Sequence, residues 1–246
     1  NHFYSKHFYK SANTMEARVL AGGLGARLQG VIGAVPKCMA PVNGRPFLGY
    51  LFDYLEKQNC TRIILSLGYK HEIITDWIEE QDLYFEVDCV IEQEPLGTGG
   101  GILAAMDVAE TDNVVVVNGD TMFNVNLQQQ KKFHTDRKAE TTLALKKMFR
   151  FDRYGIVNTA STGIITSFDE KQHRDEGMIN GGVYFINREA FLKRKLPARF
   201  SFEKDYLEAF AAQKRFFGYP SDSYFIDIGV PEDYEEAQKD FKKIFR

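Results

Sequence analysis

Between Ala17 and Val117 the sequence alternates short apolar runs with segments whose apolar residues recur at helical spacing. Strands separated by helices pair in parallel, because each crossover returns the chain to the same edge of the sheet. The unbroken β-branched run Val114–Val117 is typical of a central strand covered on both faces. The pattern predicts an α/β fold, a three-layer α/β/α arrangement around a mixed, mainly parallel sheet. Strands are expected over 17–20, 63–67, 85–91 and 114–117, and helices over 47–58, 73–78 and 102–109.

Beyond Asp120 the pattern changes to a more antiparallel one. A helix is expected over 127–136, and strands over 140–147, 164–168 and 178–186. We interpret residues 15–246 as one domain whose two halves meet near residue 125. Residues 1–14 are aromatic and basic and lack the apolar segment of a secretory signal. They are interpreted as a leader or an added extension ahead of a natural start at Met15.

Composition excludes several classes of partner. The 246 residues, 44% of them hydrophobic, can bury one substantial core. A net charge of −3 argues against nucleic acid binding. No apolar run reaches the roughly eighteen residues that a membrane span needs. The scattered cysteines at 38, 60 and 89 indicate reduced thiols in a cytoplasmic protein, and Cys38 is either activated by Lys37 beside it or a bystander.

A glycine-rich loop follows the first predicted strand. Gly22, Gly23 and Gly25 let the backbone turn sharply and present bare N–H groups to an anion. Arg27 adds a forked guanidinium, and Lys37 adds a mobile ammonium group. The loop lacks both the Gly-Lys-Ser/Thr of a Walker loop and the third glycine of a dinucleotide fingerprint. The amides and two cations together suit a triphosphate, whereas the glycines alone would also fit an ordinary turn.

Two isolated aspartates follow or interrupt apolar runs. Asp120 comes directly after the central strand, at the edge where open α/β sheets bind ligands, although aspartate is also a common turn former. Asp227 lies in the apolar run 224–230, where an unpaired carboxylate is costly to bury. If the two acids converge, they could hold one hard cation. A second glycine-rich segment, 97–101, forms either a ligand site at a helix N-terminus or a flexible connector.

The loop from Ala21 to Leu28, closed by Pro36-Lys37, resembles the signature of the sugar-1-phosphate nucleotidyltransferases, also called nucleotide-sugar pyrophosphorylases. Ala26 departs from it, since the family usually has Thr or Ser there. The resemblance runs from Met15 to about Phe241. It implies a Rossmann-like nucleotidyltransferase fold with a smaller sugar-binding lobe, nucleotide binding in the first half and sugar-phosphate binding in the second. The implied reaction joins a nucleoside triphosphate and a sugar 1-phosphate, and releases pyrophosphate.

The resemblance also implies roles for individual residues. Arg27 and Lys37 would be catalytic, and Asp120 and Asp227 would hold Mg²⁺, although Val230 replaces a family threonine nearby. The predicted nucleotide-binding residues are Ala21, Gly22, Gly23, Gly25, Gln93, Pro95, Gly97 and Thr98. The predicted sugar-phosphate-binding residues are Gly155, Glu170, Lys171, Asn180 and Glu203, for which charged turns and a helix start are the structural alternative.

Segments 36–48, 67–70 and 94–100 most resemble D-glycero-α-D-manno-heptose 1-phosphate guanylyltransferases and are similar to mannose-1-phosphate guanylyltransferases. GTP and one of these sugar phosphates are the expected substrates of a cytoplasmic enzyme, with a homodimer left open. The alternatives are a UTP- or CTP-dependent enzyme, a non-catalytic nucleotide-sugar-binding relative, which Ala26 favours, and a glycosyltransferase. The last would normally carry Asp-x-Asp where this chain has Asn118-Gly119-Asp120.

Overall fold

The computed structural model describes residues 5–6, 15–23 and 27–245. The chain forms two compact units, each discontinuous in sequence. Unit 1 comprises Asn1–Pro95, Val117–Met122 and Ile226–Arg246, and unit 2 comprises Leu96–Val116 and Phe123–Phe225. Unit 1 therefore gathers three segments that are far apart along the chain.

The strands of unit 1 follow the order β1-β6-β5-β2. β5 pairs in parallel with both β2 and β6, whereas β1 pairs with β6 in the antiparallel direction. The parallel core confirms the predicted α/β class. β1 lies in the segment that sequence analysis set aside as a leader. The bounds are β1 Ser5–Lys6, β2 Met15–Leu20, β5 Cys60–Leu67 and β6 Glu86–Ile91.

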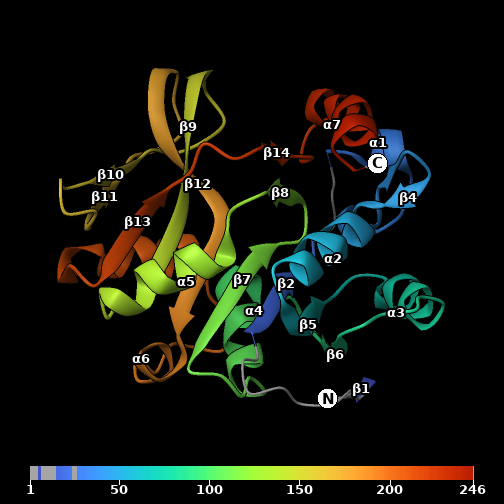
Figure 1. Ribbon diagram of the computed structural model, residues 1–246, viewed down its shortest axis with the longest axis horizontal. Coiled ribbons are helices and arrows are strands. Elements are labelled where there is room, and N and C mark those ends of the chain that lie inside the picture. Colours follow the sequence, from blue (N-terminus) through green and yellow to red (C-terminus); the bar gives the residue numbers. More distant parts are fainter. Residues whose placement is uncertain (1–4, 7–14, 24–26, 246) are drawn as a thin grey trace. The chain divides into compact units, whose positions relative to one another are not determined.

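Helices α2 and α3 lie beside β5 and β6 (Figure 1). α2 buries an apolar side that includes Leu48, Leu51 and Leu55. The C-terminal helix α7 adds Phe241, whose ring packs against Tyr50 with centroids 4.8 Å apart. The remaining bounds in this part of the fold are α1 Gln29–Ile32, η1 Lys37–Met39, β3 Pro41–Val42, β4 Arg45–Pro46, α2 Phe47–Lys57, α3 His71–Glu79, β8 Thr121–Phe123, β14 Phe225–Asp227 and α7 Pro231–Ile244.

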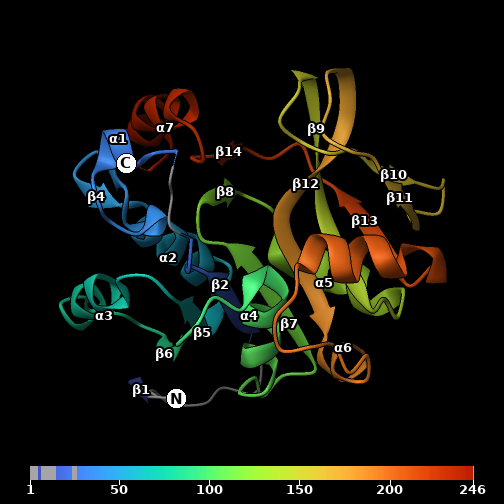
Figure 2. The same ribbon diagram turned by 180° about the vertical axis from the view of Figure 1, so that it is seen from behind.

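The strands of unit 2 follow the order β7-β12-β9-β13 (Figure 2). β9 pairs antiparallel with the long β12 and parallel with β13. The second half is thus more antiparallel, as predicted. The bounds are α4 Gly97–Met106, β7 Asn113–Asn118, α5 Leu127–Asp136, β9 Thr141–Phe151, β10 Val157–Thr159, β11 Ile165–Phe168, β12 Arg174–Asn187, α6 Arg188–Leu192, the π-helix η2 Phe202–Glu208, η3 Ala211–Gln213 and β13 Phe216–Pro220.

The predicted bounds of the helix over 102–109 are wrong. α4 begins at Gly97, so the second glycine-rich segment is the first half of a helix and not a connector ahead of it. Glycine is a poor helix former, but these glycines allow close packing. A Cβ atom at Gly99 would lie 2.2 Å from Cε2 of Phe200, and one at Gly100 would lie 2.2 Å from the carbonyl oxygen of Ala198. Close packing within unit 2 therefore outweighs the low helix propensity of these glycines.

Among the residues that the structure describes, no helix has the length and apolarity to cross a membrane.

Candidate active site

In unit 1, Lys37, Asp120 and Asp227 form a charged cluster. Lys37 Nζ donates a hydrogen bond to Asp120 Oδ2 and lies 3.6 Å from Asp227 Oδ1. The side chain of Lys37 is 14% exposed, and those of the two aspartates are 31% and 30% exposed. The structure thus brings together three predicted site residues that are far apart in sequence. Lys37 and Asp120 are 83 positions apart, and Asp120 and Asp227 are 107 positions apart.

Backbone contacts fix the positions of the two aspartates. The N–H of Ile228 donates to the carbonyl of Asp120 at 3.0 Å, which joins the two segments directly. The N–H of Gly229 donates to Asp227 Oδ1 at 2.8 Å. At Gly229 a Cβ would lie 2.8 Å from both Asp227 Oδ1 and Lys37 Nζ. A larger residue at position 229 would therefore displace the cluster.

Both carboxylates supply hard oxygen ligands. Mg²⁺ in proteins is commonly bound by one or two carboxylates together with substrate phosphates, and Asp120 and Asp227 fit that donor set. Across the described part of the chain, no group of three or more His, Cys, Asp or Glu side chains could form an all-protein metal cage.

The first glycine-rich loop is described in part. Ala21 follows β2, and its N–H donates to the carbonyl of Ser66 at 3.0 Å. Gly22 and Gly23 are exposed, and the carbonyl of Gly23 accepts from the N–H of Lys37 at 3.4 Å. Arg27 is exposed. Gly25 and Ala26 lie outside the described residues, so the family departure at Ala26 has no structural account.

The predicted nucleotide-binding residues between positions 93 and 98 are divided between the two units. Gln93 and Pro95 are exposed residues of unit 1. Gly97 and Thr98 are exposed residues at the start of α4 in unit 2. Gly97 has a φ of +74°, which favours glycine at this position.

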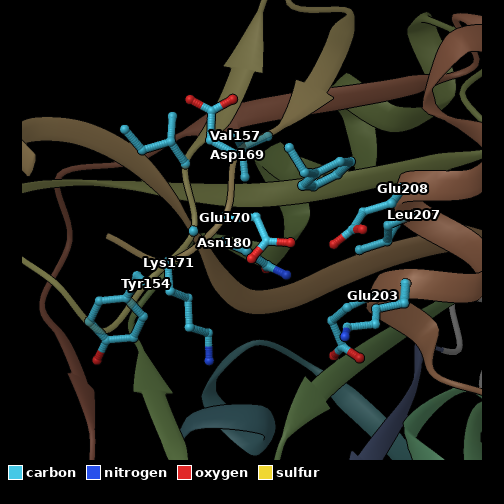
Figure 3. A pocket seen from close by; sticks show the side chains of 13 residues that line it. Tyr154, Val157, Asp169, Glu170, Lys171, Asn180, Glu203, Leu207 and Glu208 are labelled. Carbon is cyan, nitrogen blue, oxygen red and sulfur yellow. The ribbon is translucent and has the colours of Figure 1, made fainter. Parts of the chain in front are cut away.

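A cavity of about 540 Å³ in unit 2 contains all five residues predicted to bind the sugar phosphate. Glu170 and Asn180 point toward the side from which Glu203 and Glu208 approach (Figure 3). The cavity-lining residues are Tyr154, Gly155, Ile156, Val157, Phe168, Asp169, Glu170, Lys171, Asn180, Glu203, Lys204, Leu207 and Glu208.

Asn180 reaches this cavity from an irregular part of β12. The pairing with β9 shifts between Asn180 and Tyr184, and such a bulge re-aims a side chain. Asn180 Nδ2 donates to the Tyr184 hydroxyl at 2.9 Å, and its Oδ1 accepts from the N–H of Gly182 at 3.0 Å. Sequence analysis expected a strand to begin near this residue, whereas β12 already begins at Arg174.

Gly155 is confined by the backbone of the neighbouring segment that carries Asp169. A Cβ at this position would lie 2.5 Å from the carbonyl oxygen of Asp169. Asp169 in turn is held by the side chains of Asn158, at 2.7 Å, and Arg174, at 3.0 Å. The hydrogen bonds to Asp169 therefore fix the start of the turn that carries Glu170 and Lys171.

Sequence analysis missed Lys204, Leu207 and Glu208. All three come from η2, of which only Glu203 was named. Residues 203, 204, 207 and 208 lie on one side of a helical turn, so their spacing carried a signal once the segment was known to be helical.

Cys38 is a bystander to the chemistry. Its thiol is fully buried beside the charged cluster, and burial together with the negative charge of Asp120 raises its pKa to about 12. The thiol therefore stays protonated and unreactive at neutral pH. Of the two alternatives that the sequence left open, the structure supports this one.

Residues 16–244 match the protein family described as nucleotidyl transferase. A D-glycero-α-D-manno-heptose 1-phosphate guanylyltransferase of Aneurinibacillus thermoaerophilus is 49% identical over 228 residues, which cover 93% of this chain and 99% of the relative. A mannose-1-phosphate guanylyltransferase of Mycobacterium tuberculosis is 30% identical, over 94% of this chain and 65% of the relative.

A solved structure extends the similarity to the fold. HddC from Yersinia pseudotuberculosis, crystallised in complex with GMP-PN, is 36% identical with a TM-score of 0.82. The match covers 93% of this chain and 100% of that chain.

Proposed function

The chain belongs to the nucleotidyl transferase family, and on that premise we propose that it transfers GMP from GTP to a sugar 1-phosphate. D-glycero-α-D-manno-heptose 1-phosphate is the proposed acceptor, because the 49% identical relative is named for it and the match spans nearly that whole protein. Membership makes the chain a nucleotidyl-transferring enzyme, as the sequence predicted. The observation that carries the proposal is the convergence of Lys37, Asp120 and Asp227 in unit 1.

The chemistry makes few demands on acid–base catalysis. The second pKa of a phosphate monoester is about 6, so the acceptor phosphate is already largely a dianion at neutral pH. One of its oxygens forms a bond to the α-phosphorus of GTP while the bond from that phosphorus to the bridging oxygen breaks. Pyrophosphate leaves with the electron pair. The protein's task is to position two anions and offset their charge.

Cationic side chains and amides would perform that task. The exposed Arg27 and the amides of Gly22 and Gly23 are proposed to bind the β- and γ-phosphates. Lys37 would exchange its contact with Asp120 for a contact with the α-phosphate. Asp120 and Asp227 would hold Mg²⁺, which when bound neutralises charge on the reacting phosphates.

The cavity in unit 2 is the proposed acceptor site. Glu170 and Asn180 carry oxygens that accept hydrogen bonds from sugar hydroxyls, and Lys171 carries the positive charge that suits the phosphate. Gln93 and the backbone around Gly97 would contact guanine. We place the enzyme in the cytoplasm, and a homodimer remains part of the proposal.

The test is a panel of substrate pairs read out as pyrophosphate release. GTP, UTP, CTP, ATP and dTTP would each be combined with heptose, mannose and glucose 1-phosphates, with and without Mg²⁺. The proposal expects the highest kcat/KM for GTP with the heptose phosphate. A preference for UTP or CTP would assign the chain to the alternative transferases, and binding without turnover would make it a non-catalytic relative.

A further inference from the structure

Thr98, in the first turn of α4, makes two hydrogen bonds with the segment that starts η2. Its Oγ1 donates to Glu203 Oε2 at 2.7 Å. The same oxygen accepts from the N–H of Phe202 at 3.0 Å. Both partners belong to unit 2, as does Thr98. The hydroxyl of this residue is therefore already engaged with η2.

Glu203 is held through one of its two carboxylate oxygens. Oε2 accepts from Thr98 and also from the hydroxyl of Ser201, at 3.1 Å. Ser201 Oγ in turn accepts from the N–H of Lys204 at 3.2 Å, which fixes the direction of its proton. Within the described residues Oε1 has no hydrogen-bond partner, and Glu203 lines the acceptor cavity (Figure 3). One oxygen is thus anchored, and the other is available to a ligand.

The backbone holds this arrangement in register. The N–H of Gly99 donates to the carbonyl of Phe200 at 3.0 Å, and the N–H of Phe200 donates to the carbonyl of Leu96 at 3.1 Å. A Cβ at Gly97 would lie 2.6 Å from the Phe200 oxygen. The start of α4 is therefore linked to the start of η2 by backbone hydrogen bonds and close packing. A shift of Thr98 would move the segment that carries Glu203.

We propose that Thr98 is a positioning residue for the acceptor, orienting Glu203 so that its Oε1 accepts a hydrogen bond from a hydroxyl of the sugar 1-phosphate. The assignment rests on the proposed function and refines it, because sequence analysis placed Thr98 with the nucleotide. Hydrogen bonds to a carboxylate are stronger than neutral ones, and they restrict a side chain that would otherwise sample several rotamers. The hydroxyl of Thr98 acts on acceptor binding, while its backbone remains part of the glycine-rich segment.

The experiment compares Thr98→Val, which keeps the shape and loses the hydroxyl, with Thr98→Ser, which keeps the hydroxyl. Thr75→Val is the matched control, since its exposed hydroxyl bonds to the carbonyl of Glu72 within α3. For each protein, KM values for GTP and for the heptose phosphate are measured, and calorimetry gives the dissociation constant of the sugar phosphate without turnover. Thr98→Ala replaces Thr98→Val if the melting temperature shows that the latter does not fold.

Thr98→Val is expected to raise both the KM and the dissociation constant for the sugar phosphate about tenfold, the usual scale for a lost hydrogen bond to a charged group. The KM for GTP should change less than about twofold on the same scale. Thr98→Ser should restore wild-type values. In a Glu203→Ala background, Thr98→Val should have no further effect, because the two residues act in series.

A larger effect on GTP than on the sugar phosphate, no effect on either, or additive effects in the double variant would overturn the inference. So would a wild-type protein that binds no sugar 1-phosphate. Wild-type binding without turnover, accompanied by the tenfold shift in the dissociation constant, would contradict the proposed function and leave the role of Thr98 intact.

Discussion

The charged cluster of unit 1 and the cavity of unit 2, the proposed acceptor site, are built on different physical principles. In the cluster, one ammonium group meets two carboxylates, and all three side chains are partly buried. In the cavity, four acidic residues and two lysines surround a volume of about 540 Å³. The acids there are Asp169, Glu170, Glu203 and Glu208.

The difference teaches which step each region can serve. A lysine beside two carboxylates that could hold a cation suits a reaction that concentrates negative charge, because the ammonium group and the cation would offset the charge of the reacting phosphates. A spacious cavity rich in carboxylate and amide oxygens suits a polyol, whose hydroxyls donate hydrogen bonds. Variants of the cluster should therefore act mainly on kcat, and variants of the cavity mainly on the KM for the acceptor.

The largest effect is expected for Lys37→Ala. Losing one preorganised cationic donor should remove about 3 kcal/mol of transition-state stabilisation and lower kcat by more than about a hundredfold. Steady-state kinetics would measure the loss, with Lys57→Ala as the control, since Lys57 is exposed in the last turn of α2. A Lys37→Ala variant with turnover near that of the wild type would contradict the catalytic role proposed for the cluster.

Next come the aspartates. Asp120→Asn and Asp227→Asn should each lower kcat by roughly a hundredfold and raise the Mg²⁺ concentration that gives half-maximal rate, because a neutral amide is a weaker ligand. Chelation of the metal should abolish wild-type turnover. Mg²⁺ titrations of the rate would test this, with the exposed Asp76→Asn on α3 as control. An unchanged Mg²⁺ requirement in both variants would show that the two aspartates do not bind the metal.

A smaller effect is expected in the cavity. Glu170→Gln should raise the KM for the sugar phosphate about tenfold, since a charged acceptor is replaced by a neutral one, and should change kcat little. Initial rates at varied acceptor concentration would show the split. Glu176→Gln is the control, because Glu176 is an exposed residue of the neighbouring strand β12. A drop in kcat alone would assign Glu170 to the reaction step.

His134 lies in neither region, so its replacement should leave the kinetics unchanged and alter stability alone. The imidazole is 1% exposed, and burial lowers its pKa to about 4. Between that value and about 6.5 the unfolded chain binds more protons, so the free energy of unfolding falls by about 3 kcal/mol as pH decreases through this window. Urea unfolding at pH 7 and pH 4.5 should show a weaker pH dependence for His134→Gln, and equal dependence would refute the assignment.

Local patterns were sufficient to predict much of the fold. Helix α5 spans 127–136 as expected, and in the structure Asn126 caps it by accepting a hydrogen bond from the N–H of Gln129. Local patterns failed where distant segments decide the structure. The glycines at the start of α4 are helical because the 198–202 segment packs against them. That segment lies about a hundred positions further along the chain, so the local sequence around the glycines does not reveal the contact. β1 depends on pairing with β6 in the same way.

The candidate site shows the same limit. Asp120 could be singled out because it follows a buried strand, and Asp227 because it interrupts an apolar run. Their convergence on Lys37 is a tertiary fact that spacing could not supply. Glu203 was predicted from the family resemblance. Its hydrogen bond with Thr98 could not be predicted from local sequence, because the two residues are 105 positions apart.

The central claim is that the Lys37–Asp120–Asp227 cluster is the centre of nucleotidyl transfer. A crystal structure of the protein with Mg²⁺ and a non-hydrolysable GTP analogue tests it most directly. The account predicts a metal ion bound by both carboxylates and Lys37 turned from Asp120 to the α-phosphate. A nucleotide bound elsewhere, with the ion pair between Lys37 and Asp120 intact, would contradict it.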